Sequence, residues 1–343
     1  MQKNNERGIS VNLMLGSACN WNCPYCLQTE ERGFRKKPNL DWFIENFRRY
    51  IIENSIKIRR IAFWGGEPCL YWNEIKEIDG ACRDICSSPA RFITNGSLIT
   101  DEQVNYFNKH DTLVNVSYHT GELCDSQWIK CLKIHNLYVT SLINHKCLTY
   151  EPYWEKWKYL WDTYGRCVSW YVFPMKYTPG VPKEWALTHS DIDSYTEYLF
   201  SIIEKAHYDP FYRRMIEILF YTFYEKDYDN EYQNFCYNKN VLSIDLFGNK
   251  YFCHHDCSSD NIVGNIFNPL SIFKDQTFLD QLPSHRKQCQ NCPLFKHCLG
   301  GCFRDVDRTV SCYGKLKLYN FLCFVKRNYS YLVDKEFLEY IEL

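Results

Sequence analysis

The sequence predicts an α/β fold in which a parallel sheet or barrel, covered by helices, is followed by a smaller cysteine-rich domain. Strand-like and helix-like stretches alternate from residue 9 to about residue 173. Nine of the 19 cysteines fall after residue 235. A chain of 343 residues is long enough for one large core and a small second domain.

Six strands and five helices are expected in alternation. Strands are predicted at residues 9–15, 58–64, 90–94, 112–118, 138–143 and 167–173. Helices are predicted at residues 40–54, 69–80, 100–109, 125–134 and 151–163. The third helix has the clearest start, because Thr100 and Gln103 fit a capping box. Ligands of such folds lie at the carboxyl ends of the strands, so site residues are sought just after each strand.

Prolines and a glycine between residues 174 and 182 break regular structure and end the first domain. A helix is expected next, capped from Ser190 through Asp193. A hairpin with a Gly248-Asn249 turn is predicted over residues 241–252. The predicted domains are a barrel at 1–182, a helical bridge at 183–232, and a cysteine-rich α+β domain with a C-terminal helix at 233–343.

The charge and hydropathy of the chain exclude several classes of protein. A net charge of -1 and a pI near 6.8 argue against binding to nucleic acid or to a membrane surface. No apolar run reaches the length of a membrane span, and no signal-peptide core precedes residue 9, so a cytoplasmic location is expected. In that reducing compartment, 19 cysteines indicate metal binding or catalysis more than disulfides.

The first cysteine group follows the first strand as C-x3-C-x2-C, formed by Cys19, Cys23 and Cys26. Three thiolates can hold three irons of a 4Fe-4S cluster and leave the fourth iron open to a small molecule. An open metal position usually indicates chemistry and not a structural role. The pair Cys23 and Cys26 alone would also fit a thioredoxin-like redox motif, to which Cys19 is an objection.

A second motif, Trp64-Gly65-Gly66-Glu67-Pro68, closes the second predicted strand. Together the two motifs resemble the radical SAM enzymes, whose fold is a partial (β/α)6 barrel. The resemblance implies a 4Fe-4S cluster on the first three cysteines and S-adenosylmethionine beside the Gly-Gly-Glu loop. Paired glycines allow close backbone approach, and carboxylates accept from ammonium groups. By this resemblance, cofactor binding is expected of Tyr25, Gly65, Gly66, Glu67, Asn95, Ser117 and His119.

The late cysteines resemble the SPASM domain, which carries auxiliary iron–sulfur clusters. A zinc ribbon is the alternative, since paired C-x2-C units bind zinc, but one zinc site uses only four sulfurs. The resemblance implies two auxiliary 4Fe-4S clusters, three in all. The outer cluster is expected on Cys289, Cys292, Cys298 and Cys323, and the inner one on Cys236, Cys253, Cys302 and Cys257. Cys312 is an alternative to Cys257, and an open iron is a third possibility.

The resemblance implies a radical SAM oxidoreductase that abstracts hydrogen from a ribosomally made peptide and forms an oxidative C–C or C–S cross-link. Formylglycine formation, as in anaerobic sulfatase maturation, is an alternative, although His254 stands where those members have an aspartate. Epimerisation is another, and a glutaredoxin-like protein with a zinc module is an alternative of a different class. Expected partners are the precursor peptide, a donor such as flavodoxin or ferredoxin, and a separate leader-binding protein if recognition needs one. No catalytic acid or base is assigned.

Overall fold

The computed structural model describes residues 8–26, 28, 38–118, 123–146, 150–166, 168–175, 177–221, 241–251, 253, 257, 261–268, 289, 291–298, 301 and 304–339. The chain divides into two compact units, each assembled from separate segments. The first unit comprises Met1–Tyr118, Glu122–Tyr138 and Phe235–Pro283, and the second comprises His119–Gly121, Val139–Asn234 and Ser284–Leu343. The three-part division expected from the sequence stays a prediction.

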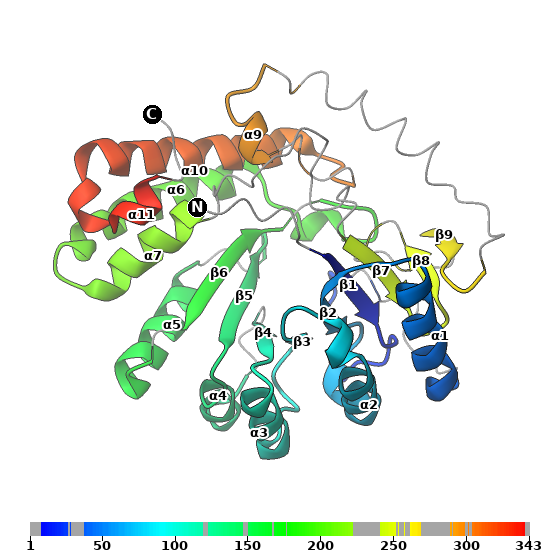
Figure 1. Cartoon of the computed structure of the whole chain (residues 1–343). Helices are drawn as coiled ribbons and strands as arrows, with labels where there is room; N and C mark the ends of the chain where they lie inside the picture. The colour runs from blue at the N-terminus through cyan, green and yellow to red at the C-terminus, as the bar shows by residue number, and fades with distance from the viewer. Residues whose placement is uncertain are drawn as a thin grey trace. The chain divides into compact units, whose positions relative to one another are not determined.

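The first unit is built on a mostly parallel sheet (Figure 1). Its strands are β1 (Ile9–Met14), β2 (Ile58–Trp64), β3 (Arg91–Thr94), β4 (Leu113–Ser117), β7 (Val241–Asp245), β8 (Asn249–Tyr251) and β9 (Ile262–Asn265). They lie in the order β4-β3-β2-β1-β7-β8-β9, with β7 parallel to β1 and with β8 and β9 antiparallel. The predicted hairpin is confirmed as β7 and β8, and it extends the sheet that β1 begins.

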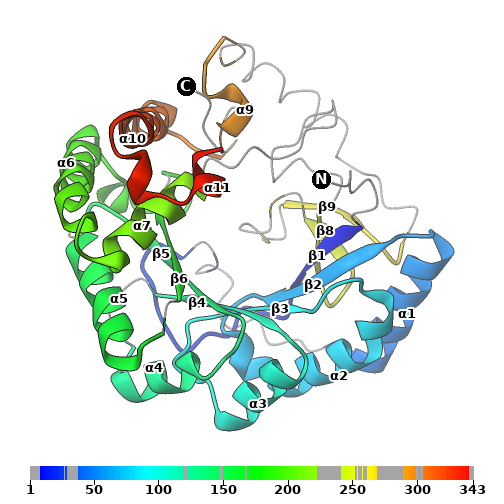
Figure 2. The same cartoon turned by 60° about the vertical axis from the view of Figure 1, so that its left-hand side comes forward.

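Helices cover one face of this sheet, as Figure 2 shows. They are α1 (Leu40–Glu53), α2 (Trp72–Cys82), α3 (Asp101–Lys109) and α4 (Asp125–Leu132), with 3-10 turns at Pro68–Tyr71 and Arg83–Ile85. Phe92 of β3 faces these helices, since the centroid of its ring lies 4.8 Å from that of Phe107 in α3. Side chains alternate along a strand, so Arg91 and its parallel partner Ala62 lie on the helix-free face.

The second unit contains two strands and most of the remaining helices. Its elements are β5 (Leu137–Ile143), whose first two residues belong to the first unit, β6 (Ser169–Pro174), α5 (Tyr150–Tyr164), α6 (His189–Ala206), α7 (Pro210–Tyr221), α9 (Phe295–Cys298), α10 (Arg308–Asn328), α11 (Lys335–Leu338), and 3-10 turns at Lys183–Trp185 and Ser330–Leu332. Helix α10 packs along α6. The ring centroids of Phe321 and Phe200 lie 5.2 Å apart, and the Tyr313 hydroxyl donates to Asp193 Oδ1 at 2.6 Å.

All six predicted strands and five predicted helices are present, with ends that differ by a few residues. The capping box at Thr100 and Gln103 is confirmed. The predicted cap at Ser190 is wrong, because α6 begins at His189 and its N-cap is Thr188. There the Asp191 carboxylate accepts from the Thr188 N–H at 2.7 Å. Among the described helices, none is both long enough and apolar enough to cross a membrane.

Candidate functional site

The cysteine loop leaves β1 and rests directly on the Gly65-Gly66 turn that follows β2. The Glu67 N–H donates to the carbonyl of Ala18 at 2.8 Å. Gly66 has a φ of +53°, and a Cβ there would lie 2.0 Å from the Ala18 oxygen. Only glycine tolerates this approach, so the paired glycines allow the two loops to pack together.

The three thiols of this loop form a donor set suited to an iron–sulfur cluster. Cys19, Cys23 and Cys26 are partly exposed, and none of them forms a disulfide. Thiolates are the protein ligands that such clusters take. Within the described residues, no three His, Cys, Asp or Glu side chains gather around a point where a single metal ion would fit. A cluster does not require that arrangement, because each cysteine binds a different iron.

Glu67 joins the exit of β2 to the exit of β3. Its side chain is 1% exposed. One carboxylate oxygen accepts from the Cys69 N–H at 3.0 Å and the Thr94 hydroxyl at 2.6 Å, and the other accepts from the Asn95 N–H at 2.8 Å. Burial raises the pKa of Glu67, although these three hydrogen bonds oppose the shift. The predicted contact of this residue with an ammonium group stays a prediction.

A ring of polar side chains ties the cysteine loop to the loop after β3. The amide of Asn95 donates to Asn20 Oδ1 at 2.9 Å, and Asn20 donates to Ser97 Oγ at 2.9 Å. The Ser97 hydroxyl completes the ring by donating to Asn95 Oδ1 at 2.6 Å. The structure therefore brings Asn95, a predicted site residue, against two residues that sequence reasoning missed. The available signal was their position inside motifs already singled out, between Cys19 and Cys23 and after Gly96.

The remaining predicted cofactor residues differ in how they are placed. Tyr25 is buried, with 6% of its surface exposed. Ser117 ends β4 and lies on the helix-free face, since it shares a face of the strand with Leu113, the register partner of Arg91. His119 lies outside the described residues. Gln28 was not predicted, and its side-chain oxygen accepts from the Gly66 N–H at 2.9 Å.

Comparison with known proteins identifies this arrangement. Residues 13–122 match the family model of the Radical SAM superfamily. The chain carries a radical SAM domain. The match spans the cysteine loop, the Gly-Gly-Glu turn and the exits of the third and fourth strands, so the radical SAM prediction made from those motifs is confirmed. The family implies a 4Fe-4S cluster and S-adenosylmethionine as cofactors.

Proteins similar to most of the chain include a radical SAM enzyme and solved structures with the same fold. The radical SAM cyclopropyl synthase TigE of Paramaledivibacter caminithermalis is 24% identical over 341 residues, which cover 88% of this chain and 69% of TigE. Native anSMEcpe with bound AdoMet and Cp18Cys peptide has the same fold, with a TM-score of 0.68, 16% identity, and coverage of 93% of this chain and 99% of that one. These findings support an enzyme.

A second similar structure is that of Streptococcus suis SuiB bound to precursor peptide SuiA. Its TM-score is 0.58 at 17% identity, covering 87% of this chain and 72% of that chain. At such low identity the solved structures show the fold alone. The predicted α/β fold of the radical SAM type, with an additional C-terminal region, is confirmed.

In the first unit, two late cysteines lie beside the strand that leads into the radical SAM cysteine loop. Cys257 is 6% exposed and packs in one cluster with Tyr251 and with Met14, the last residue of β1. Its sulfur lies 3.8 Å from the carbonyl oxygen of Cys253, which is also buried. The carboxyl end of β1 therefore has both cysteine regions next to it. The other two predicted ligands of the inner cluster, Cys236 and Cys302, lie outside the described residues.

In the second unit, three late cysteines act electrostatically on a fourth, Cys312. Partial burial raises the pKa of Cys312, and the neighbouring thiols of Cys298, Cys289 and Cys292 raise it further. Cys312 lies in the first turns of α10, whereas Cys323 lies eleven residues further along the same helix. At 1.5 Å per residue, the two are about 16 Å apart along the axis. Intact α10 cannot bring both thiols to one cluster.

Proposed function

We propose that this protein is a radical SAM peptide maturase that closes an oxidative carbon–carbon or carbon–sulfur bond in a ribosomally made peptide. The observation that carries the proposal is the three-cysteine loop seated on the Gly65-Gly66 turn within the matched domain. The naming of TigE as a radical SAM cyclopropyl synthase supports bond closure, and the peptides bound to anSMEcpe and SuiB support a peptide as the substrate.

Each part of the site has a task in this proposal. Cys19, Cys23 and Cys26 would hold the cluster, and S-adenosylmethionine would bind beside the glycine turn. The bound pair supplies a 5′-deoxyadenosyl radical able to take a hydrogen atom from an unactivated carbon. Glu67 and the Asn20-Asn95-Ser97 ring hold three strand exits in fixed relation. The Ser117 hydroxyl is proposed to hydrogen-bond the ribose or the methionine part.

The late cysteines are proposed to hold two auxiliary 4Fe-4S clusters. For the inner cluster, the proximity of Cys253 and Cys257 supports Cys257 as a ligand. For the outer cluster, the electrostatic effect of Cys289, Cys292 and Cys298 on Cys312 favours Cys312 in the place first given to Cys323. Such clusters suit a net oxidation, since they can accept the electron that leaves the peptide as the new bond forms.

The first experiment is metal analysis after anaerobic reconstitution of the full chain. Three clusters require about twelve irons per chain and no stoichiometric zinc. Stoichiometric zinc with little iron would support the glutaredoxin-like alternative.

The triple variant C19A/C23A/C26A should lose all reductive cleavage of S-adenosylmethionine, because the open iron site is gone. Cleavage at the normal rate by this variant would contradict the radical SAM mechanism.

The second experiment identifies the bond. A cross-link and a cyclopropane both lower the mass of the peptide by two hydrogens. Tandem mass spectrometry separates them, because a cross-link suppresses fragmentation between two residues, while a ring inside one side chain leaves the fragment ladder intact. The relationship to TigE makes the ring the second candidate. A product that reacts with a hydrazide would be an aldehyde and would support formylglycine, and an unchanged mass would support epimerisation.

A further inference from the structure

Three polar side chains lie around Ala62 on the helix-free face of the sheet in the first unit. Asn12 of β1 is the register partner of Ala62 in β2, and Ala62 is in turn the partner of Arg91 in β3. Arg60 precedes Ala62 by two residues, so its side chain lies on the same face. The three side chains therefore surround a residue whose own side chain is a single methyl group.

Each of the three offers a buried N–H that has no acceptor. Asn12 is 9% exposed, and within the part of the chain that the structure describes its Nδ2 atom makes no hydrogen bond. The same holds for the Nε atoms of Arg60 and Arg91. Among the ion pairs of the described residues, none includes either arginine. Buried donors in native proteins are nearly always satisfied, so three of them around one residue indicate an acceptor that a ligand supplies.

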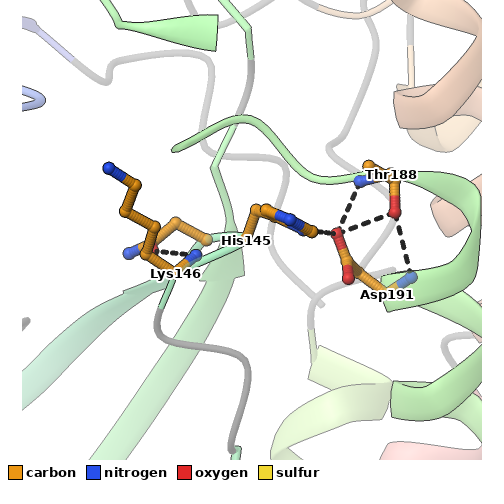
Figure 3. Close-up of polar contacts among 5 residues, drawn as sticks. His145, Lys146, Thr188 and Asp191 are labelled. Carbon is orange, nitrogen blue, oxygen red and sulfur yellow. Dashed lines mark hydrogen bonds and ion pairs between the residues drawn. The ribbon is translucent and has the colours of Figure 1, made fainter. Parts of the chain in front are cut away.

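Two buried carboxylates elsewhere show the usual arrangement, in which an opposite charge lies beside a buried charge. In the second unit, Oδ2 of Asp191 lies 2.9 Å from Nδ1 of His145 (Figure 3). In the first unit, Asp79 pairs with Arg83. The two arginines beside Ala62 differ from these groups, because no carboxylate of the described residues pairs with them.

The positive charges on this face also act on one another. Burial lowers the pKa of Arg60, and the charges of Arg59 and Arg91 lower it further. The guanidinium carbon of Arg91 lies 5.4 Å from the centre of the Tyr138 ring, an arrangement that holds the cation in place. Tyr138 belongs to the same unit. A bound anion would offset the positive charge and supply the missing acceptor atoms.

The two arginines lie before the strand exits where the radical SAM cofactors are proposed to bind. Arg60 precedes Trp64 by four residues, and Arg91 precedes Asn95 by four. At a rise of about 3.3 Å per residue, each arginine is about 13 Å from the exit of its strand. S-adenosylmethionine is proposed to bind at those exits, so its carboxylate is not the expected ligand. An extended peptide covers the same distance in about four residues.

We propose that Asn12, Arg60 and Arg91 bind the carboxylate of an aspartate or glutamate side chain in the substrate peptide. This inference rests on the proposed function. Guanidinium groups match the geometry of carboxylates and of phosphates. A ribosomally made peptide carries carboxylates in its own side chains, whereas a phosphate requires a separate modification. The carboxylate is therefore the favoured ligand.

The test measures the affinity of three probes for the anaerobically reconstituted full chain by calorimetry. The probes are a capped alanine–glutamate–alanine tripeptide, the same tripeptide with glutamine in the centre, and inorganic phosphate. Loss of a charge-assisted hydrogen bond should weaken binding of the glutamate peptide by about 10–100-fold in Arg60→Gln and in Arg91→Gln. Arg48→Gln is the control, since Arg48 lies on α1 and donates to the exposed Asp84 at 2.8 Å. It removes the same charge and should leave the affinity unchanged.

The three probes also decide the class of ligand. Binding of the glutamate peptide without binding of the glutamine peptide would support the inference. Equal affinity for the two peptides, or no binding of the glutamate peptide, would overturn it. Tighter binding of phosphate than of the glutamate peptide would overturn it as well, by assigning the site to a phosphorylated ligand.

Chemical labelling of the wild-type chain tests the site without any substitution. The glutamate peptide should slow the reaction of phenylglyoxal with Arg60 and Arg91 but not with Arg48, as mapped by mass spectrometry. S-adenosylmethionine alone should not protect the two arginines. Protection by S-adenosylmethionine would assign them to the cofactor and overturn the inference.

Stability separates a binding role from a structural one. Replacing an unpaired, half-buried charge by an apolar side chain of similar length should keep or raise the urea midpoint of the peptide-free chain in Arg60→Met. A lower midpoint together with unchanged peptide affinity would show a structural arginine and overturn the inference. Cleavage of S-adenosylmethionine is measured in the same preparations. A wild-type chain that binds the glutamate peptide but forms no 5′-deoxyadenosine would contradict the proposed function and still support the carboxylate site.

Discussion

At the scale of single residues, the site depends on one backbone position that no side chain can occupy. Gly66 combines a positive φ with a carbonyl oxygen only 2.0 Å from where its Cβ would stand, far closer than van der Waals contact allows. The oxygen belongs to Ala18, which immediately precedes the first cluster cysteine. Any substitution must therefore displace the loop on which the three thiols are carried.

Gly66→Ala should prevent the first cluster from assembling, because the added methyl group pushes Ala18 away. Iron content after reconstitution should fall by about four per chain, and S-adenosylmethionine cleavage should be lost. Gly80→Ala is the matched control, since nothing lies within 4 Å of a Cβ built at that helical position. It should gain about 0.5–1 kcal/mol of stability and keep its iron. Full iron content in Gly66→Ala would show that the loop tolerates the methyl group.

Glu67→Gln should destabilise the fold by about 1–3 kcal/mol, because an amide nitrogen replaces an oxygen that accepts a buried hydrogen bond. Urea unfolding of the unliganded chain measures this. Glu102→Gln is the control, since that exposed carboxylate receives hydrogen bonds from Trp72 and Lys76 at the surface. It should change stability little. Equal losses in the two variants would contradict a special role for the buried carboxylate.

The raised pKa of Glu67 also predicts a dependence of stability on pH. Between its ordinary value near 4.5 and the raised value, the folded state binds more protons than the unfolded state. The wild-type free energy of unfolding should therefore fall as pH rises through this window. Glu67→Gln should lack this contribution. The comparison is made by urea unfolding at a series of pH values, and identical slopes in the two proteins would refute it.

At the scale of elements, the geometry of α10 keeps two cysteines too far apart to share a cluster. A straight helix separates Cys312 and Cys323 by about 16 Å, so one cluster can use only one of them. Cys312→Ser should lose about four irons per chain, whereas Cys323→Ser should keep them. Iron analysis and the visible absorbance of the cluster measure the difference. The opposite result would restore Cys323 to the outer cluster.

At the scale of the whole molecule, the proposed mechanism assigns radical formation and the later electron transfer to different parts of the chain. The radical SAM match ends at residue 122, and Cys289 and Cys292 belong to the second unit. The double variant C289A/C292A should still cleave S-adenosylmethionine but should not release modified peptide, because the departing electron has no acceptor. Chromatography with mass detection quantifies both products. Normal peptide modification by this variant would exclude the outer cluster from turnover.

The sequence by itself determined those features that depend on neighbouring residues. Apolar residues at strand spacing predicted the six strands, and apolar residues at helix spacing predicted the five helices. Both patterns are local, because the residues that an element buries recur at the period of that element. The Thr100 capping box could also be predicted, because its two residues, Thr100 and Gln103, are only three positions apart. The cluster motif at Cys19, Cys23 and Cys26 is also local, since three ligands of one cluster lie within eight residues.

Only the tertiary structure decided which distant residues meet. Asn20 and Asn95 are 75 positions apart, and no local pattern in either segment indicates that their side chains form a hydrogen bond. The start of α6 shows the physical reason most clearly. Thr188 with Asp191 and Ser190 with Asp193 have the same cap spacing, so local pattern could not choose between them. In the folded chain, Asp191 also pairs with His145 and Asp193 accepts from Tyr313, so packing assigns each carboxylate its role.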